Sequence, residues 1–288
     1  MKNKQKILNI HLLSLAAICL TSFAVTAQSN QKWFRKELGV AQSSVYDNGH
    51  SLARYKGTGL QLQLGFDRET SKGFRQFDNT LVWTPLKAQV SDNKNVTSAT
   101  QGNYKMSYKY LRNVTPSQNK IKVSVGASLF ADANVRIYNS LVNNIFGWDV
   151  NLGLNVVGQA TRDFKLGKHS LSASYQLGVP LVVYNHSPNY LGTVPVGKAF
   201  EQKNDTNWSS LGRLVTGLSN KYFYLHQQFS VEKHLSSGDR LRLTYSWDYS
   251  NNGYASHRYQ NLITGVSIGM LTSFSKKRTA NKTSQTTR

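Results

Sequence analysis

Apolar and polar residues alternate along much of the chain. Between residues 121 and 129 every odd position is apolar and every even position is polar or glycine. The same period of two recurs in five further segments, at residues 60–67, 104–110, 148–156, 171–179 and 240–249. Because successive side chains of a β-strand point to opposite faces, the pattern predicts strands with one apolar face and one polar face.

The composition of the two faces favours a membrane barrel over a soluble β-sandwich. The polar face is rich in charged residues and glycine, and the apolar face ends in aromatic residues, as interfacial girdles do. These aromatic residues are Phe66, Trp83, Tyr110, Trp148 and Tyr249. We therefore predict an all-β fold, a closed antiparallel up-and-down transmembrane β-barrel. A soluble periplasmic β-protein with a filled core is the alternative architecture.

The connections between the expected strands alternate in length. Short turns are predicted near residues 68–74, 114–119, 161–168 and 236–239. Longer polar loops are predicted near residues 88–103, 132–146, 183–220 and 250–258. Short periplasmic turns and long extracellular loops are typical of bacterial outer-membrane barrels.

Nine strands follow from the pattern, the last over about residues 262–274. Two periplasmic termini require an even number, so a tenth strand is expected between residues 37 and 46, where the alternation is weak. Eight strands is the alternative count.

Both ends of the chain lie outside the predicted barrel domain of residues 28–274. Residues 1–27 have three lysines, an apolar run and small residues near Ala27, which predicts a Sec signal peptide and export to the outer membrane. An uncleaved N-terminal anchor is the alternative. The segment from Ser267 to Phe274 resembles the terminal signal that barrel-assembly machinery recognises. Residues 275–288 are polar and basic, and a disordered periplasmic tail is expected there.

The net charge indicates an anionic partner. Loss of residues 1–27, with three lysines and no acid, would lower the formal charge from +21 to +18. Outer-membrane lipids including lipopolysaccharide, or another anionic ligand, would match this excess. Nucleic acid is not expected, because the chain would be exported and carries no recognisable binding motif.

Several charged residues have the parity of the polar face and are expected in the barrel lumen. They are Lys105, Lys109, Lys122, Asp149, Glu232, Arg240, Arg242 and Asp248. An internal network of ion pairs that fills a narrow barrel is one interpretation. A narrow anion-selective channel is the other, although open channels are typical of barrels with about 16 to 18 strands.

The favoured function is a structural or ligand-binding barrel that acts through its extracellular loops, without catalysis. Long loops are often functional, and Tyr190 and Trp208 are the candidate binding residues of the largest one. A rim hydrolase acting on lipid or peptide, built from His226, Ser230 and Glu232, is a less favoured alternative. No cofactor is expected, and the histidines lack the spacing of a metal site.

Short motifs also resemble an uncharacterised family of predicted outer-membrane β-barrel proteins from Bacteroidota. They are the run Arg54–Leu60, Tyr175 with Gln176, the run Val179–Leu181 and the run Ser187–Tyr190. The resemblance covers about residues 51–274 and implies a barrel in the outer membrane. It implies no activity, and residues 191–194 depart from the aromatic character of similar sequences.

Overall fold

The computed structural model describes residues 31–48, 51–70, 72–89, 96–115, 120–139, 145–186, 213–216, 218–219, 222–254 and 257–274. The predicted signal peptide, the predicted basic tail, Tyr190 and Trp208 lie outside the described residues. No helix in the described part of the chain is long and apolar enough to cross a membrane.

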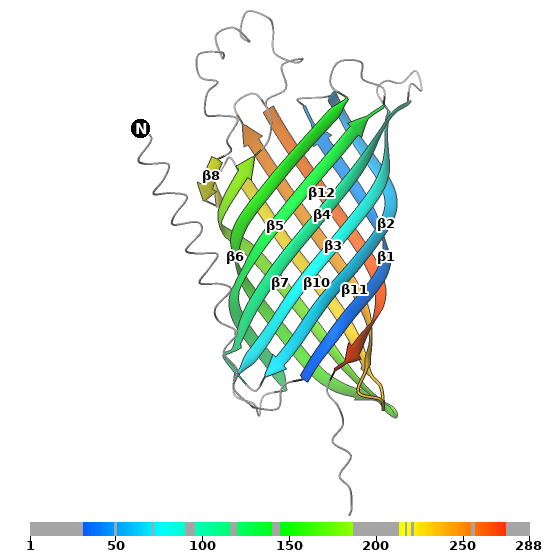
Figure 1. Cartoon of the computed structure of the whole chain (residues 1–288), viewed down its shortest axis with the longest axis vertical. Coiled ribbons are helices and arrows are strands. Elements are labelled where there is room, and N and C mark those ends of the chain that lie inside the picture. Colours follow the sequence, from blue (N-terminus) through cyan, green and yellow to red (C-terminus); the bar gives the residue numbers. More distant parts are fainter. Residues whose placement is uncertain are drawn as a thin grey trace, which may run out of the picture. The chain divides into compact units, whose positions relative to one another are not determined.

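The described chain forms one antiparallel sheet that closes on itself (Figure 1). Its strands are β1 (Gln31–Asp47), β2 (Ser51–Thr70), β3 (Gly73–Gln89), β4 (Val96–Asn113), β5 (Ile121–Tyr138), β6 (Phe146–Leu166), β7 (His169–His186), β8 (Arg213–Thr216), β9 (Leu218–Ser219), β10 (Tyr222–His234), β11 (Arg240–Tyr254) and β12 (His257–Ser273).

Two pairings close the barrel. Consecutive strands pair with each other from β1 to β7 and from β10 to β12, β7 pairs with β10, and β1 pairs with β12. The short strands β8 and β9 only extend the edges of β7 and β10. The barrel wall therefore has ten strands, which confirms the predicted fold, and the eight-strand alternative is wrong. The expected tenth strand is β1, which is longer than the predicted segment.

Several loops are shorter than predicted, because the hydrogen-bonded strand pairs extend beyond the segments in which apolar and polar residues alternate. The region predicted as a loop at residues 88–103 belongs largely to β3 and β4, whose pairing continues to Gln89 and Val96. Likewise β5 reaches Tyr138 and β6 begins at Phe146. Membrane-spanning strands need only about 9–11 residues. The strands forming the wall have 13 to 21 residues, so polar stretches that look like loops continue the barrel beyond its apolar zone.

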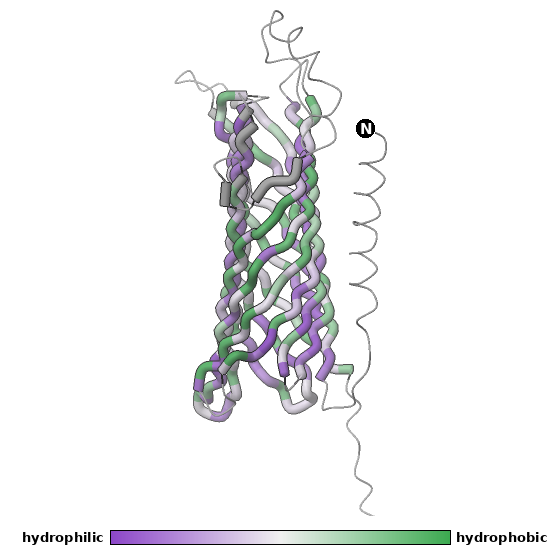
Figure 2. Tube along the Cα trace, turned by 90° about the vertical axis from the view of Figure 1, so that its left-hand side faces the viewer, coloured by the Kyte–Doolittle hydropathy of each residue, from purple (hydrophilic) through white to green (hydrophobic). Residues whose placement is uncertain are grey.

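Burial alternates along the strands as the period of two requires. Figure 2 shows hydrophilic and hydrophobic residues interspersed along the barrel wall. On β2, Leu60, Leu62, Leu64 and Phe66 are exposed on the outside, whereas Gln61 and Asp67 are buried inside. Leu60 is 65% exposed and Ile268 on β12 is 66% exposed. The barrel thus has an apolar outer surface around a polar interior, the reverse of a soluble protein.

Short turns join strands at the lower end of the barrel. The lower end in Figure 1, where β1 begins, has the turns joining β2 to β3, β6 to β7 and β10 to β11. In the last of these turns Gly238 has φ of 93°, which favours glycine. The neighbouring Asp239 accepts hydrogen bonds from the Ser273 backbone N–H at 2.9 Å and the Ser237 hydroxyl at 2.9 Å. These donors hold the pKa of the Asp239 carboxyl below its usual value.

Neighbouring strands come very close at several inward-facing glycines. A Cβ atom at Gly59 would lie 1.9 Å from the Trp83 carbonyl oxygen and 2.6 Å from the Thr84 Cα atom on β3. Both are backbone atoms, so a side chain here would require strand movement. Gly158 on β6 faces outward, and a Cβ atom there would have no atom within 4 Å.

We expect Gly59→Ala to destabilise the barrel by about 1–3 kcal/mol, the usual cost of overpacking, because β2 and β3 must separate. The measurement is the temperature at which the compact band of an unboiled gel sample converts to the unfolded band. Gly158→Ala is the matched control and should leave that temperature unchanged. Equal temperatures for the two variants would contradict the close approach.

Candidate functional site

The lumen is the part of the barrel where the chemically reactive side chains gather. Its buried charged residues comprise six acids and four bases among the residues that the structure describes. They are Glu37, Asp47, Asp67, Asp132, Asp149 and Glu232, with Arg35, Lys109, Arg136 and Arg242. Buried charges need partners, because removing an ion from water costs several kcal/mol. Nine of the ten belong to three clusters along the barrel, and Asp132 instead accepts a hydrogen bond from the side-chain amide of Asn103 at 2.6 Å.

The lower cluster is the largest, and its charged members come from both ends of the sequence. Its residues are Arg35, Glu37, Asp67, Glu69, Asp78, Lys109, Glu232, Arg240 and Arg242.

Two arginines of the lower cluster share the same carboxylates. Arg35 on β1 contacts Asp78, and its Nη1 atom lies 3.7 Å from Asp67 Oδ2. Arg242 on β11 donates from Nε to Glu232 Oε1 at 2.8 Å, and its Nη2 atom lies 3.4 Å from Asp67 Oδ2. Asp67 therefore joins the two guanidinium groups.

Lys109 connects the lower cluster to strand β7 across the lumen. Lys109 on β4 lies with Nζ 3.1 Å from Asp78 Oδ2 on β3 and donates to Gln176 Oε1 on β7 at 2.7 Å. Arg240 closes the lower end: it donates to Glu232 Oε2 at 2.9 Å, and its guanidinium lies 3.9 Å from the ring centre of Trp33.

The middle cluster consists of Lys105, Tyr224, His226 and Asp248. Lys105 Nζ on β4 lies 2.6 Å from Asp248 Oδ1 on β11. These strands stand opposite each other, with five strand steps between them along the wall in either direction. His226 Nδ1 lies 2.7 Å from the same oxygen, and the Tyr224 hydroxyl donates to it at 2.8 Å. One carboxylate therefore joins opposite walls of the barrel.

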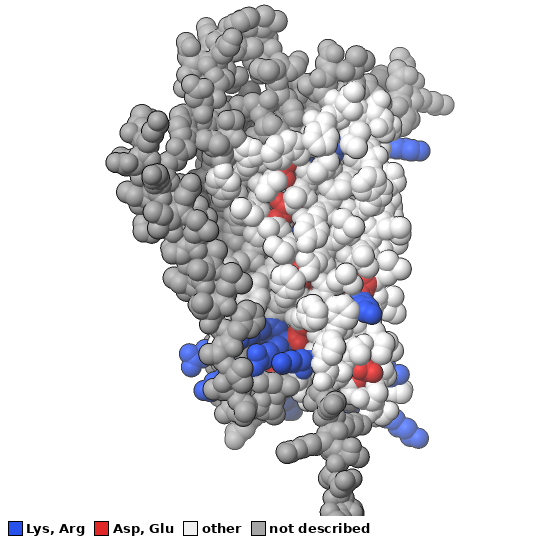
Figure 3. Space-filling model, in the orientation of Figure 1, with Lys and Arg blue, Asp and Glu red and all other residues white. Residues whose placement is uncertain are grey.

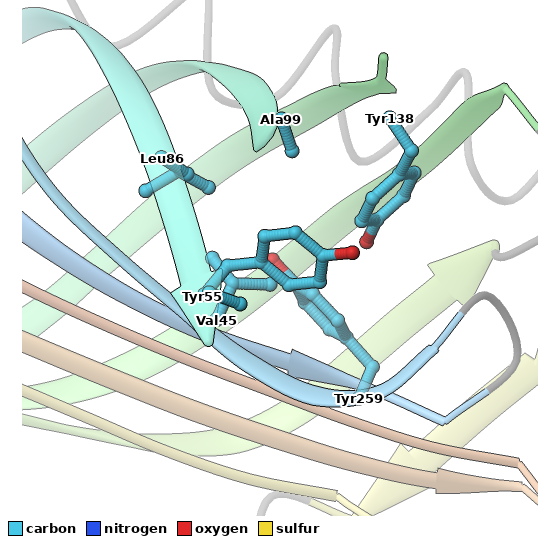
Figure 4. Close-up of a cluster of buried hydrophobic side chains, with 7 residues drawn as sticks. Val45, Tyr55, Leu86, Ala99, Tyr138 and Tyr259 are labelled. Carbon is cyan, nitrogen blue, oxygen red and sulfur yellow. The ribbon is translucent and has the colours of Figure 1, made fainter. Parts of the chain in front are cut away.

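The upper cluster combines ion pairs with an apolar group of side chains (Figure 4). Arg136 on β5 lies 3.2 Å from Asp47 Oδ2 and 2.5 Å from Asp149 Oδ2 through its Nη2 and Nη1 atoms. Its guanidinium is 4.1 Å from the ring centre of Tyr259 on β12. Buried apolar residues pack beside it: Val45, Tyr55, Leu86, Ala88, Ala99, Tyr138 and Tyr259.

The tyrosines tie this apolar group to the ion pairs. The rings of Tyr55 and Tyr138 meet edge to face with centroids 5.4 Å apart, and the Tyr138 hydroxyl donates to Asp47 Oδ2 at 3.1 Å. Aromatic rings thus fill the lumen where the strands extend above the apolar zone.

A small cavity lies between the lower and middle clusters. Its volume is about 40 Å³, and Arg35, Asp78, Lys105, Lys109, His226 and Asp248 are among its lining residues. Since one buried water needs about 10–15 Å³ of such volume, there is room for roughly three water molecules. The cavity is too small for an organic substrate.

The structure places the sequence-predicted lumen residues in different environments. Lys105 and Asp248 belong to the middle cluster, Lys109, Glu232, Arg240 and Arg242 to the lower cluster, and Asp149 to the upper cluster. Lys122 pairs with Asp163 at 2.9 Å near the lower end, where the two side chains are 46% and 53% exposed. It lies outside the buried network.

Sequence reasoning missed Arg35, Glu37 and Arg136, which connect much of the network. The alternation of β1 is weak because its outer face includes Lys36, Gln42 and Ser44. Arg136 lies in a segment predicted as a loop. The even positions are polar or glycine from residue 122 to residue 128, and Asp132, Asn134 and Arg136 continue this series. Extending the alternation past residue 129 could therefore have located Arg136.

The residues considered for hydrolysis do not form a nucleophile–base pair. Ser230 is buried, and its hydroxyl lies 2.7 Å from the Ser174 hydroxyl. His226 pairs instead with Asp248, and Glu232 with two arginines. Among the described residues, no group of three or more His, Cys, Asp or Glu side chains could hold a metal ion.

An apolar exterior, a closed ten-strand wall and an ion-paired lumen define a class of narrow β-barrels. Within that class, the chain belongs to the family described as "Protein of unknown function (DUF3316)", whose sequence model matches residues 9–281. No curated protein matches the chain in sequence.

Solved structures with a similar arrangement share little sequence with the chain. The outer membrane protease OmpT from Escherichia coli is 8% identical, with 88% of this chain and 100% of that chain covered, at a TM-score of 0.47. The transport unit of the autotransporter AIDA-I from Escherichia coli is 10% identical, with 88% and 94% covered, at 0.42. The translocator domain of autotransporter NalP from Neisseria meningitidis is 10% identical, with 93% and 97% covered, at 0.36.

We expect Glu232→Gln to destabilise the barrel by about 3–5 kcal/mol, because Arg240 and Arg242 would lose the charge of a shared buried carboxylate. The midpoint of urea unfolding, followed by loss of the compact unboiled band, measures the change. Lys122→Gln is the control. It removes an exposed ion pair and should cost at most about 1 kcal/mol. Similar midpoints for the two variants would show that the lower cluster contributes no special stability.

Proposed function

We propose that the chain is an outer-membrane β-barrel with a sealed lumen, and that it has a structural or ligand-binding role through its extracellular loops, without catalysis. The observation that carries the proposal is the set of contacts joining opposite walls at three levels of the barrel. A wall ten strands wide encloses little space, and side chains fill it here. Function is then expected on the outer surface and the loops.

The apolar exterior supports the membrane location. Leucine, isoleucine and aromatic side chains are exposed around the barrel, while the interior contains the acidic residues of the strands. This arrangement suits hydrocarbon outside and polar groups inside. The Sec signal peptide, insertion by barrel-assembly machinery and an origin in Bacteroidota remain predictions from the sequence.

The narrow anion-selective channel is the second candidate, and the lumen charge argues against it. The buried charged residues of the described strands include more acids than bases. Lys105 and Lys109, the lysines that such a pore would present to an anion, contact Asp248 and Asp78. Anion passage would require both pairs to open.

Catalysis by a rim hydrolase finds equally little support. Ser230, His226 and Glu232 lie inside the barrel, and each is engaged with a different partner. His226 and Glu232 therefore do not act as a base for the Ser230 hydroxyl.

We expect the purified, folded protein to produce no stepwise ion conductance in a planar lipid bilayer, because the three clusters block the lumen. Insertion is verified by flotation of the same preparation with liposomes. Steps carried by anions in the wild type, and lost in Lys105→Gln with Lys109→Gln, would favour the channel. Steps of either selectivity would refute the sealed lumen.

We expect the loop that contains Tyr190 to face the cell exterior and the β10–β11 turn to face the periplasm. Because the chain has a single cysteine, Cys19, inside the predicted signal peptide, Tyr190→Cys and Ser237→Cys each introduce one reactive thiol. A membrane-impermeant maleimide on intact cells should label Tyr190→Cys and should label Ser237→Cys only after the outer membrane is permeabilised. The opposite pattern would reverse the orientation, and recovery of the wild type in the soluble periplasm would overturn the membrane location.

A further inference from the structure

Charge is sorted between the two faces of the barrel wall. Every acidic residue on the described strands has the parity of the lumen face. The outward positions of the strands carry basic residues and no acids among the described residues. In the view of Figure 3 most visible Lys and Arg side chains lie toward the lower end, and others lie near the upper end. The outward positions of the described strands therefore have a positive charge without a counter-charge from any described residue on those positions.

One group of outward bases lies near the upper end on β2, β3 and β12, with β1 between β2 and β12, and we call it the upper basic patch. It consists of Arg54 and Lys56 on β2, Lys87 on β3 and Arg258 on β12. Lys56 and Lys87 are directly opposite each other in the β2–β3 ladder, and both are exposed. Arg54 donates to Gln260 Oε1 on β12 at 3.1 Å, which links it to the strand of Arg258.

This arrangement is unfavourable unless an anion is bound. Like charges directly opposite each other on neighbouring strands destabilise a sheet. Neither Lys56 nor Lys87 has a carboxylate of any described residue within ion-pair distance. The lysines of the lumen differ, since Lys105 and Lys109 both contact aspartates. No described residue supplies the missing negative charge.

The depth of the patch indicates where that charge lies. Lys56 and Arg68 are 12 residues apart on β2, and Arg75 and Lys87 are 12 residues apart on β3. Twelve residues at about 3.3 Å each, in strands tilted by about 40°, span roughly 30 Å along the barrel axis. That is about the thickness of the hydrocarbon core of a bilayer. The basic residues on both strands therefore bracket the core at the level of lipid headgroups.

The residues just below the patch suit acyl chains. Leu60 and Trp83 are paired in the β2–β3 ladder, four residues from Lys56 and Lys87, and they are 65% and 55% exposed. A free phosphate ion would use only the bases. An amphiphile with a phosphorylated head would use the bases and the apolar surface together.

We propose that the upper basic patch binds the phosphorylated headgroup of an outer-leaflet glycolipid of the lipid A type, with the acyl chains against Leu60 and Trp83. The inference rests on the proposed outer-membrane function and names a partner for its outer surface. Lys56 and Lys87 hold one phosphate between them, and Arg54 and Arg258 extend the patch toward β12. The bound lipid removes the repulsion between the two lysines.

The test is native mass spectrometry of the full-length folded protein in detergent with bisphosphorylated lipid A. The wild type should retain the lipid, and Lys56→Gln with Lys87→Gln should weaken its binding by at least about tenfold. Arg68→Gln with Arg75→Gln is the matched control. It removes the other opposed basic pair of the same two strands at the lower end, and it should bind lipid A as the wild type does.

The competing outcomes are separable. Undiminished binding by the upper double variant would overturn the proposal, and so would equal binding of a dephosphorylated lipid A. Displacement of lipid A by millimolar inorganic phosphate would show a simple phosphate site and would also overturn it. Should the glutamine variant lose its heat-modifiable band, Lys56→Arg with Lys87→Arg keeps the charges and must retain binding. The maleimide experiment on cells tests the outer-membrane location independently, so failure of one proposal does not resemble failure of the other.

Discussion

The rest of the structure depends on the confinement of inward side chains within a wall of ten strands. Alternate side chains of each strand point inward, and the hydrogen bonds between strands fix that orientation. The lumen is narrow enough for Lys105 on β4 to contact Asp248 on the opposite strand β11 at 2.6 Å. A buried charge in such a space needs a partner on a neighbouring or an opposite strand, because otherwise the cost of its lost hydration is not offset. The three clusters satisfy this requirement for the other buried charges of the described strands, and Asp132 accepts a hydrogen bond from Asn103.

The same constraint explains how the net charge is distributed. The chain has 35 basic and 14 acidic residues, so a uniform arrangement would leave every region basic. Instead the strand acids are on the lumen face, where they neutralise arginines and lysines that would otherwise be isolated. The outward positions of the described strands carry bases and no acids. The total charge thus describes the outside of the molecule, and the lumen has the opposite balance.

The period of two predicted the strands, the closed barrel and the inward parity of residues such as Lys109 and Arg242, because these properties are local. It could not predict which residues meet across the lumen. That depends on the stagger of the strands around the closed sheet, which links Arg35 to Asp78 and Arg136 to Asp149. The pattern also failed where outward positions are polar, as in β1, and where strands continue above the apolar zone, as around Arg136.

The contacts across the lumen also have a mechanical consequence. A hollow barrel can be flattened by changing the angles between neighbouring strands while every ladder bond is kept. Lys105 with Asp248, and Arg136 with Asp47 and Tyr259, act as spokes that fix the distance between opposite walls. A cross-section held in this way stays round under the lateral pressure of surrounding lipid. The wall then offers a stiff frame.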